Sequence, residues 1–93
     1  MLTIFSKPNC PHCKSAKKLL TSMNIDFTTK DITRDPLAHS FLVGEGHRTV
    51  PQFYQGDILL FEGGYSALKT RTKEQLNEMI GDINVTKPKF TNL

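Results

Sequence analysis

The first part of the chain changes from an alternating pattern to a helical one. Residues 2–5 alternate between apolar and polar side chains, which is typical of a strand. Residues 6–9 predict a turn, because they contain the turn-forming residues proline and asparagine. Pro11 suits the first position of a helix. The apolar face of that helix recurs at three- and four-residue steps, through Cys13, Ala16, Leu19, Leu20 and Met23.

The next segment carries the signals of a second strand and a short helix. Residues 25–32 predict a strand with Ile25 and Phe27 on one face. Asp35 and Pro36 are then predicted to be the N-cap and the first residue of a helix. The apolar stripe of this helix comprises Leu37, Ala38, Phe41 and Leu42.

The last part of the chain predicts a hairpin followed by helical structure. Residues 52–54 and 58–61 are expected to be strands around a turn at residues 55–57. A short turn capped by Ser66 is expected after Gly63-Gly64. The final helix is expected to begin with a capping box and to have a periodic apolar face. These residues are Thr72 and Gln75 for the box, and Leu76, Met79, Ile80 and Ile83 for the face.

The predicted order of elements is β-α-β-α-β-β-α. A strand–helix–strand unit pairs its strands in parallel through a right-handed crossover, whereas a hairpin is antiparallel. A mixed four-stranded sheet flanked by helices satisfies both conditions, which gives an α/β fold of the thioredoxin-like type. We expect one domain over residues 1–83, because residues 84–93 have no period and are predicted to be a loosely held tail.

Composition and charge exclude several classes of protein. The chain has 93 residues, of which 38% are hydrophobic and 23% charged, as in ordinary globular proteins. No apolar run approaches the roughly 18 residues of a membrane span, and no basic region precedes the short apolar N-terminus. The net charge of +3 is small for a protein that binds nucleic acid. We therefore expect a cytoplasmic protein without a membrane or nucleic-acid partner. A monomer is also expected.

The chain has two cysteines, Cys10 and Cys13, which are too close in sequence to join distant parts of a fold. In a reducing cytosol such a pair is more often redox-active or metal-binding than structural. Zinc requires four ligands, usually in two pairs, and His12, His39 and His47 have no paired spacing. Redox chemistry is therefore favoured over a metal site and over two inert cysteines.

The start of a helix makes the two thiols unequal. Cys10 lies where the first amide groups of the helix lack partners and its dipole is positive, and Lys7 adds a further positive charge. We expect Cys10 to be an exposed, ionised nucleophile, and Cys13, one turn later, to be largely buried. Cys10 would attack a disulfide, and Cys13 would then release the product.

Three segments together resemble one known family. They are Ser-Lys-Pro-Asn-Cys-Pro-His-Cys at residues 6–13, Thr-Val-Pro-Gln-Phe at residues 49–53 and Gly-Gly-Tyr-Ser at residues 63–66. In this order and spacing the chain resembles the glutaredoxin family from about Leu2 to Ile80. The resemblance implies a glutathione-dependent dithiol–disulfide oxidoreductase with roles in electron transport and cell redox homeostasis. Cys10 would be its nucleophile and Cys13 its resolving thiol.

The same resemblance implies a site for glutathione. Lys7 would face the glycine carboxylate, and residues 49–51 match the cis-proline segment that binds the cysteinyl part as an extra strand would. Residues 64–66 would hold the γ-glutamyl end at a helix start. The implied glutathione-binding residues are Lys7, His12, Thr49, Val50, Pro51, Gly64, Tyr65 and Ser66.

Two residues depart from the family pattern. The usual tyrosine between the cysteines is His12, which would either lie exposed or lend charge to the thiolate as the pH falls. The acidic residue that often follows the Gly-Gly-Tyr-Ser pattern is Ala67, which removes one partner for the amino group of glutathione.

Three functional hypotheses follow. In the first, two glutathiones re-reduce the protein, which reduces protein disulfides and glutathione mixed disulfides without a metal. In the second, thioredoxin reductase recycles the protein, which donates electrons to ribonucleotide reductase; residues 63–66 argue against this, because they fit a glutathione site. In the third, Cys10 and glutathione hold an iron–sulfur cluster across a dimer, which Pro11 disfavours.

Overall fold

The computed structural model describes residues 2–84, which form four strands and four helices in the predicted order. The short helix α3 lies where a short turn capped by Ser66 is predicted, and the other seven elements follow the order β-α-β-α-β-β-α. The elements are β1 (Leu2–Ser6), α1 (Pro11–Ser22), β2 (Phe27–Asp31), α2 (Pro36–Gly44), β3 (Gln52–Gln55), β4 (Ile58–Leu59), α3 (Gly64–Leu68) and α4 (Lys73–Asn84). The expectations for the Ile83 side chain and for a tail after Asn84 concern parts outside the described structure.

The sheet has the strand order β2-β1-β3-β4. β1 pairs with β2 in parallel and with β3 antiparallel, and β3 and β4 form the antiparallel hairpin. The predicted mixed four-stranded α/β fold is therefore confirmed. The second strand is shorter than predicted, because the Ile25 amide still donates to the Leu20 carbonyl at the end of α1, at 3.0 Å. The Ile25 side chain nevertheless joins the core.

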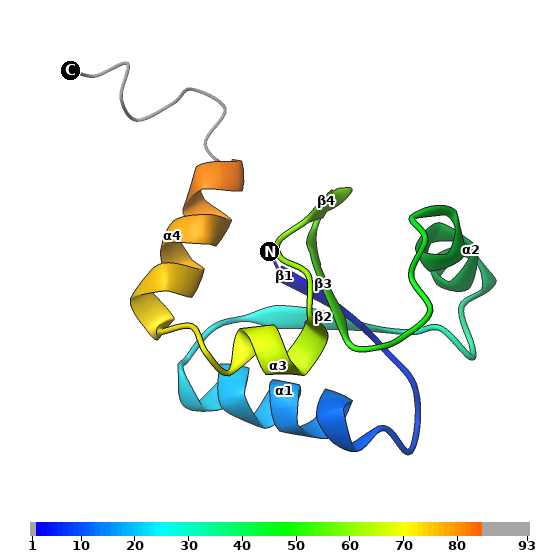
Figure 1. Cartoon of the computed structure of the whole chain (residues 1–93), viewed down its shortest axis with the longest axis horizontal. Helices are drawn as coiled ribbons and strands as arrows, with labels where there is room; N and C mark the ends of the chain where they lie inside the picture. Colours follow the sequence, from blue (N-terminus) through cyan, green and yellow to red (C-terminus); the bar gives the residue numbers. More distant parts are fainter. Residues whose placement is uncertain (1, 85–93) are drawn as a thin grey trace.

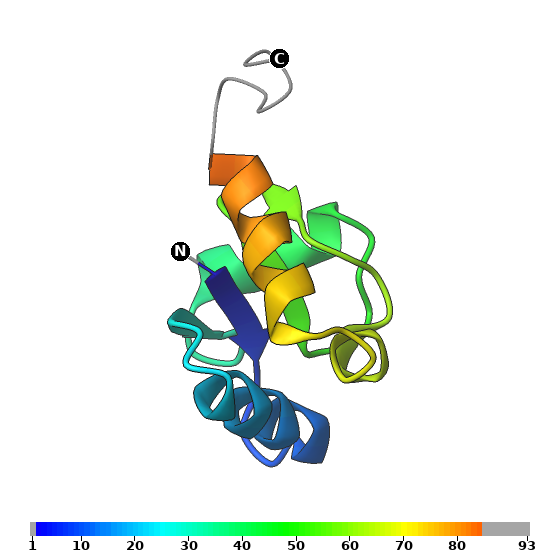
Figure 2. The same cartoon turned by 90° about the vertical axis from the view of Figure 1, so that its left-hand side faces the viewer.

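Helices cover both faces of the sheet, and each face has its own apolar cluster. Alternation along β1 and β3 sends Ile4 and Phe53 to one face and Phe5 and Tyr54 to the other. α1, α3 and α4 pack on the first face, whereas α2 packs on the second (Figure 1). Figure 2 looks onto α4 and places α2 behind the sheet.

Two expectations about the helices are wrong. Leu37 is 82% exposed rather than part of the buried stripe of α2, because Ala38 and Leu42 face the sheet. Ser66 is not an N-cap, because α3 begins two residues earlier, with Gly63 as its cap. The other predicted caps are present: Asp35 accepts from the Leu37 and Ala38 amides, and Thr72 and Gln75 exchange the two hydrogen bonds of a capping box.

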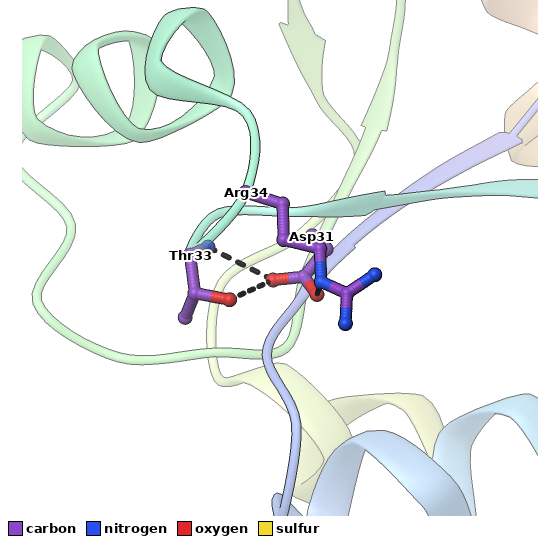
Figure 3. A network of polar contacts seen from close by, with 3 residues as sticks. All are labelled: Asp31, Thr33 and Arg34. Carbon is purple, nitrogen blue, oxygen red and sulfur yellow. Dashed lines mark hydrogen bonds and ion pairs between the residues drawn. The ribbon is translucent and has the colours of Figure 1, made fainter.

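A polar network closes the end of β2 and leads the chain into α2. The Asp31 carboxylate accepts hydrogen bonds from the Thr33 amide at 2.8 Å and the Thr33 hydroxyl at 2.6 Å (Figure 3). Arg34 Nε lies 3.8 Å from the same carboxylate. The hydrogen bonds from Thr33 lower the pKa of Asp31 below its usual value, because they stabilise the ionised form. The turn between β2 and α2 is thereby fixed.

Candidate active site

A disulfide joins Cys10 and Cys13 at the start of α1, with 5.2 Å between their Cα atoms. Cys10 is the N-cap residue of the helix, in an extended conformation, and Pro11 occupies the first helical position. A proline is tolerated there because its missing N–H group would have no partner within the helix. The sequence Cys-Pro-His-Cys therefore places the second cysteine on the first turn, within reach of the first.

Backbone N–H groups at the helix start bond both the sulfur and the carbonyl oxygen of Cys10. The Cys13 amide donates to Cys10 Sγ at 3.2 Å, and the Lys14 amide donates to the Cys10 carbonyl at 3.1 Å. After reduction, a donor at this distance and the positive end of the helix dipole would both stabilise a thiolate at Cys10. Lys7 is exposed in the loop between β1 and α1. The local electrostatics thus favour Cys10 as the nucleophile.

Cys10 is less exposed than the sequence predicts. Cys10 is 6% exposed and Cys13 is 1% exposed, so both are buried, although the order between them is as expected. In the oxidised state Cys10 Sγ is covered by its bond to Cys13. The Val50 carbonyl oxygen also lies near this sulfur, at 3.9 Å.

The segment before β3 lies beside the disulfide because of the register of two neighbouring strands. Phe5, near the end of β1, pairs with Gln52, the first residue of β3. The loop that leads to Cys10 and the loop that contains Val50 and Pro51 therefore leave the sheet at the same end. The Val50–Pro51 peptide bond is cis, as the resemblance implied for this segment.

Gly63 and Gly64 bring the start of α3 against Pro51. Both have positive φ angles, of 102° and 57°, which side chains rarely tolerate. A Cβ atom at Gly64 would lie 3.1 Å from the Pro51 carbonyl oxygen. The close approach therefore requires glycine at this position, and it places Tyr65 and Ser66 beside the cis-proline segment.

These segments enclose a groove of about 330 Å³, which we call the Tyr65 groove. It contains seven of the eight residues predicted to bind glutathione, and the His12 and Tyr65 rings lie 5.9 Å apart in it. Lys7 is the one predicted residue that does not line it. The lining residues are His12, Thr49, Val50, Pro51, Gln52, Gly63, Gly64, Tyr65 and Ser66.

A second groove of about 510 Å³ begins at Lys7 and runs along α2, and we call it the α2 groove. It shares Thr49 and Val50 with the Tyr65 groove. The two grooves therefore meet at Val50, whose carbonyl oxygen lies beside the Cys10 sulfur. The lining residues are Lys7, Ile32, His39, Leu42, Val43, Gly46, His47, Arg48, Thr49 and Val50.

The sequence pattern missed Gln52, which supports the loop that contains the cis-proline. The buried Gln52 side chain donates from Nε2 to the Thr49 carbonyl oxygen at 2.9 Å. The available signal was a glutamine directly before Phe53 and Tyr54, which point into the two apolar clusters. A buried amide needs a polar partner, and here Thr49 provides it.

Tyr54 anchors the segment before Arg48. Its hydroxyl lies 2.6 Å from His47 Nε2 and donates to Glu45 Oε1 at 3.4 Å. Burial of the ring, and then the negative charge of Glu45, raise the pKa of Tyr54 to about 12. Since Tyr54 belongs to β3, this network connects the sheet to the loop that walls both grooves.

Among residues 2–84, no three His, Cys, Asp or Glu side chains gather as a metal site would require. No helix in the same part of the chain has the length and hydropathy to cross a membrane.

Comparison with known sequences gives one family. The model of the Glutaredoxin family matches residues 2–59. Glutaredoxin-1 of Gallus gallus is 35% identical over 86 residues, which cover 88% of this chain and 82% of the relative. The hybrid peroxiredoxin hyPrx5 of Haemophilus influenzae is 36% identical over 55 residues, which cover 59% of this chain but only 23% of that longer protein.

Solved structures share the fold. Buckwheat glutaredoxin, solved as a complex with glutathione, has a TM-score of 0.67 and 24% identity, covering 87% of this chain and 76% of that one. The glutaredoxin-like NrdH-redoxin of Escherichia coli has a TM-score of 0.63 and 23% identity, covering 83% and 91%.

Proposed function

This chain belongs to the glutaredoxin family of thiol–disulfide oxidoreductases, and we propose that glutathione is its reductant. The substrates in this proposal are protein disulfides and glutathione mixed disulfides. The protein would work as a monomer in a reducing compartment such as the cytoplasm, where glutathione is available to regenerate it.

The observation that carries the proposal is the position of the Tyr65 groove. Its walls contain the cis-proline segment and the start of α3, and the Val50 carbonyl oxygen at its edge lies 3.9 Å from Cys10 Sγ. A tripeptide with a central cysteine would place its sulfur at Cys10 if its backbone paired with Val50 as a strand does. Lys7, in the adjoining groove, would face the carboxylate at the other end.

The proposed cycle transfers two electrons. The Cys10 thiolate attacks one sulfur of the substrate disulfide, so that one substrate thiol leaves and a mixed disulfide forms. Cys13 loses its proton and attacks Cys10 Sγ, which releases the second substrate thiol and forms the Cys10–Cys13 disulfide. Two glutathiones then reduce this disulfide, first forming a glutathione mixed disulfide at Cys10 and then leaving as oxidised glutathione.

A coupled assay with glutathione, glutathione reductase and NADPH tests this proposal on two variants. Cys10→Ser should lose all turnover, because it removes the attacking sulfur. Cys13→Ser should retain deglutathionylation, which needs only Cys10, and should lose the dithiol reduction of protein disulfides. Turnover of wild type with thioredoxin reductase but not with glutathione would refute the choice of reductant.

That outcome would favour a second candidate, a redoxin that thioredoxin reductase recycles. The observation on its side is the similarity to NrdH-redoxin, described as a glutaredoxin-like protein with a thioredoxin-like activity profile. In this case ribonucleotide reductase would be a candidate electron acceptor. The Tyr65 groove favours glutathione, because a protein reductant has no need of a cleft of this size beside Cys10.

A further inference from the structure

The α2 groove is larger than a glycine end of glutathione requires. Of its lining residues, the predicted glutathione site uses Lys7, Thr49 and Val50. The rest of the groove is formed by Ile32, which precedes α2, by α2 itself and by the loop that follows it. This part of the surface therefore has room for a different ligand, adjacent to the reacting sulfur.

The charges in the α2 groove have one sign. Lys7 and Arg48 are cationic, His39 and His47 accompany them, and none of the described residues that line the groove is acidic. The neighbouring carboxylates have partners of their own. Asp31 is bound by Thr33 and Arg34 (Figure 3), and Glu45 accepts a hydrogen bond from Tyr54. The groove thus attracts acidic groups.

Apolar side chains lie between these charges. Ile32, Leu42 and Val50 line the groove. Val43 lines it as well and is 59% exposed, one of the large apolar side chains most open to solvent within residues 2–84. An apolar side chain of a bound segment would remove this surface from water, which is favourable.

The position of the groove relates it to the chemistry at Cys10. The groove reaches Val50, whose carbonyl oxygen lies 3.9 Å from Cys10 Sγ. When a disulfide of a protein substrate is at Cys10, the residues next to its cysteine are within reach of this groove. The α2 groove matches a segment that is acidic and has one apolar side chain.

We propose that the α2 groove selects protein substrates by binding an acidic segment, with one apolar side chain, next to the substrate disulfide. The inference rests on the oxidoreductase function, because it assigns substrate specificity to the same site. The Cys10 thiolate breaks the substrate disulfide as described above, and Cys13 completes the two-electron reduction. The groove binds and orients the substrate segment and takes no part in the thiol–disulfide exchange itself.

The test is a single-turnover reaction of the pre-reduced protein with peptide disulfides. One peptide has Asp, Glu and Leu beside its disulfide, a second has Asn, Gln and Leu, and a third has Asp, Glu and Ser. Wild type should react about tenfold faster with the first peptide than with the second at low ionic strength. This advantage should nearly vanish at about 1 M salt, where charges are screened.

Three variants assign the effect to the groove. Arg48→Glu should abolish the preference for the acidic peptide, whereas Lys18→Glu, with the same change of charge on the exposed surface of α1, should keep it. Val43→Ser should reduce the advantage of the peptide with Leu over that with Ser. Uncharged hydroxyethyl disulfide should react equally with wild type and with all three variants.

Equal rates for the acidic and amide peptides with wild type would overturn the inference. Loss of the preference in Lys18→Glu to the extent seen in Arg48→Glu would also overturn it, since net charge would then be the cause. A matching loss of rate with hydroxyethyl disulfide in Arg48→Glu would do the same. The reaction contains no glutathione, so its result is independent of which reductant the coupled assay identifies.

Discussion

At the scale of single residues, Gly64 determines how closely α3 approaches the cis-proline segment. Its φ angle is 57°, and an added Cβ would lie 3.1 Å from the Pro51 carbonyl oxygen, a backbone atom that cannot rotate away. Tyr65 and Ser66 follow directly in the sequence. The width of the Tyr65 groove therefore depends on the absence of a side chain at Gly64.

Gly64→Ala should therefore raise the KM for glutathione several-fold and lower the free energy of unfolding by about 1 kcal/mol or more. The matched control is Gly44→Ala in α2, where nothing lies within 4 Å of the added Cβ. This control should leave KM unchanged and leave stability unchanged or slightly raised. Steady-state kinetics and urea unfolding measure both effects, and equal KM values for the two variants would contradict the prediction.

Tyr54 makes the fold less stable at alkaline pH. Burial and the charge of Glu45 raise its pKa from 10.0 to about 12, so the folded state holds the phenol proton more tightly than the unfolded state. The stabilisation is complete below pH 10 and is lost as the pH rises toward 12. A difference of this size corresponds to roughly 2–3 kcal/mol.

Tyr54→Phe should lose this alkaline dependence and should also lose about 1 kcal/mol at neutral pH, because the hydrogen bonds to His47 and Glu45 disappear. Urea unfolding at several pH values from about 8 to about 11.5 measures both quantities, because this range includes the usual pKa of a tyrosine. Retention of the full alkaline decline in Tyr54→Phe would assign it to other groups.

At the scale of elements, each helix that contributes to the site begins at a defined cap. Cys10 caps α1 with its own sulfur, and Gly63 is the N-cap residue of α3. Asp35 caps α2 by accepting from the Leu37 amide at 3.1 Å and the Ala38 amide at 3.2 Å. α2 in turn positions His39 and Val43 in the α2 groove.

Asp35→Ala should lower the free energy of unfolding by about 1 kcal/mol, whereas Asp35→Asn, which keeps an acceptor, should lower it by much less. Because the first turn of α2 is then less ordered, its amides should exchange with solvent faster while those of α1 should not. Hydrogen exchange followed by mass spectrometry separates the two helices. Equal stability of both variants would show that the cap contributes little.

At the scale of the whole molecule, β1 and β3 connect the two apolar clusters, because each strand sends residues to both faces. The apolar cluster on the face covered by α2 is small, and it includes Phe5 and Tyr54 from these central strands. Neither cluster can therefore lose its packing without disturbing strands that the other cluster needs.

Leu20→Ala and Leu42→Ala, one in each cluster, should both shift one common unfolding transition. Leu20 is fully buried and Leu42 is 4% exposed, so each change should cost about 2–5 kcal/mol. Circular dichroism and tyrosine fluorescence should report the same midpoint in each variant. Two separate transitions in Leu42→Ala would show that the α2 layer unfolds alone.

The sequence was sufficient for the elements that local physics determines. Pro11, Asp35 and the Thr72–Gln75 pair marked helix starts correctly, because capping depends on residues close in sequence. The family pattern also predicted which loops adjoin the disulfide, and seven of its residues meet in one groove. Their roles toward glutathione stay predictions.

The remaining features depend on tertiary contacts that periodicity does not contain. Leu37 satisfied the helical stripe but faces solvent, since the sheet meets α2 one residue later, at Ala38. Cys10 was expected to be exposed and is covered by Cys13 and Val50 in the oxidised state. The α2 groove is lined by residues from the loop between β1 and α1, from α2 and from the cis-proline loop. No local sequence pattern predicts that these three segments meet.

The pairing of Phe5 with Gln52 has a practical consequence for engineering this protein. Both reactive loops leave the sheet at that end, whereas the Gly56–Asp57 turn lies at the opposite end, beyond the pairing of Leu2 with Gln55. A fluorescent reporter or an affinity tag spliced into that turn should leave the redox centre undisturbed. A single residue inserted after Thr49 would shift the cis-proline relative to the sulfur and disable a biosensor built on this scaffold.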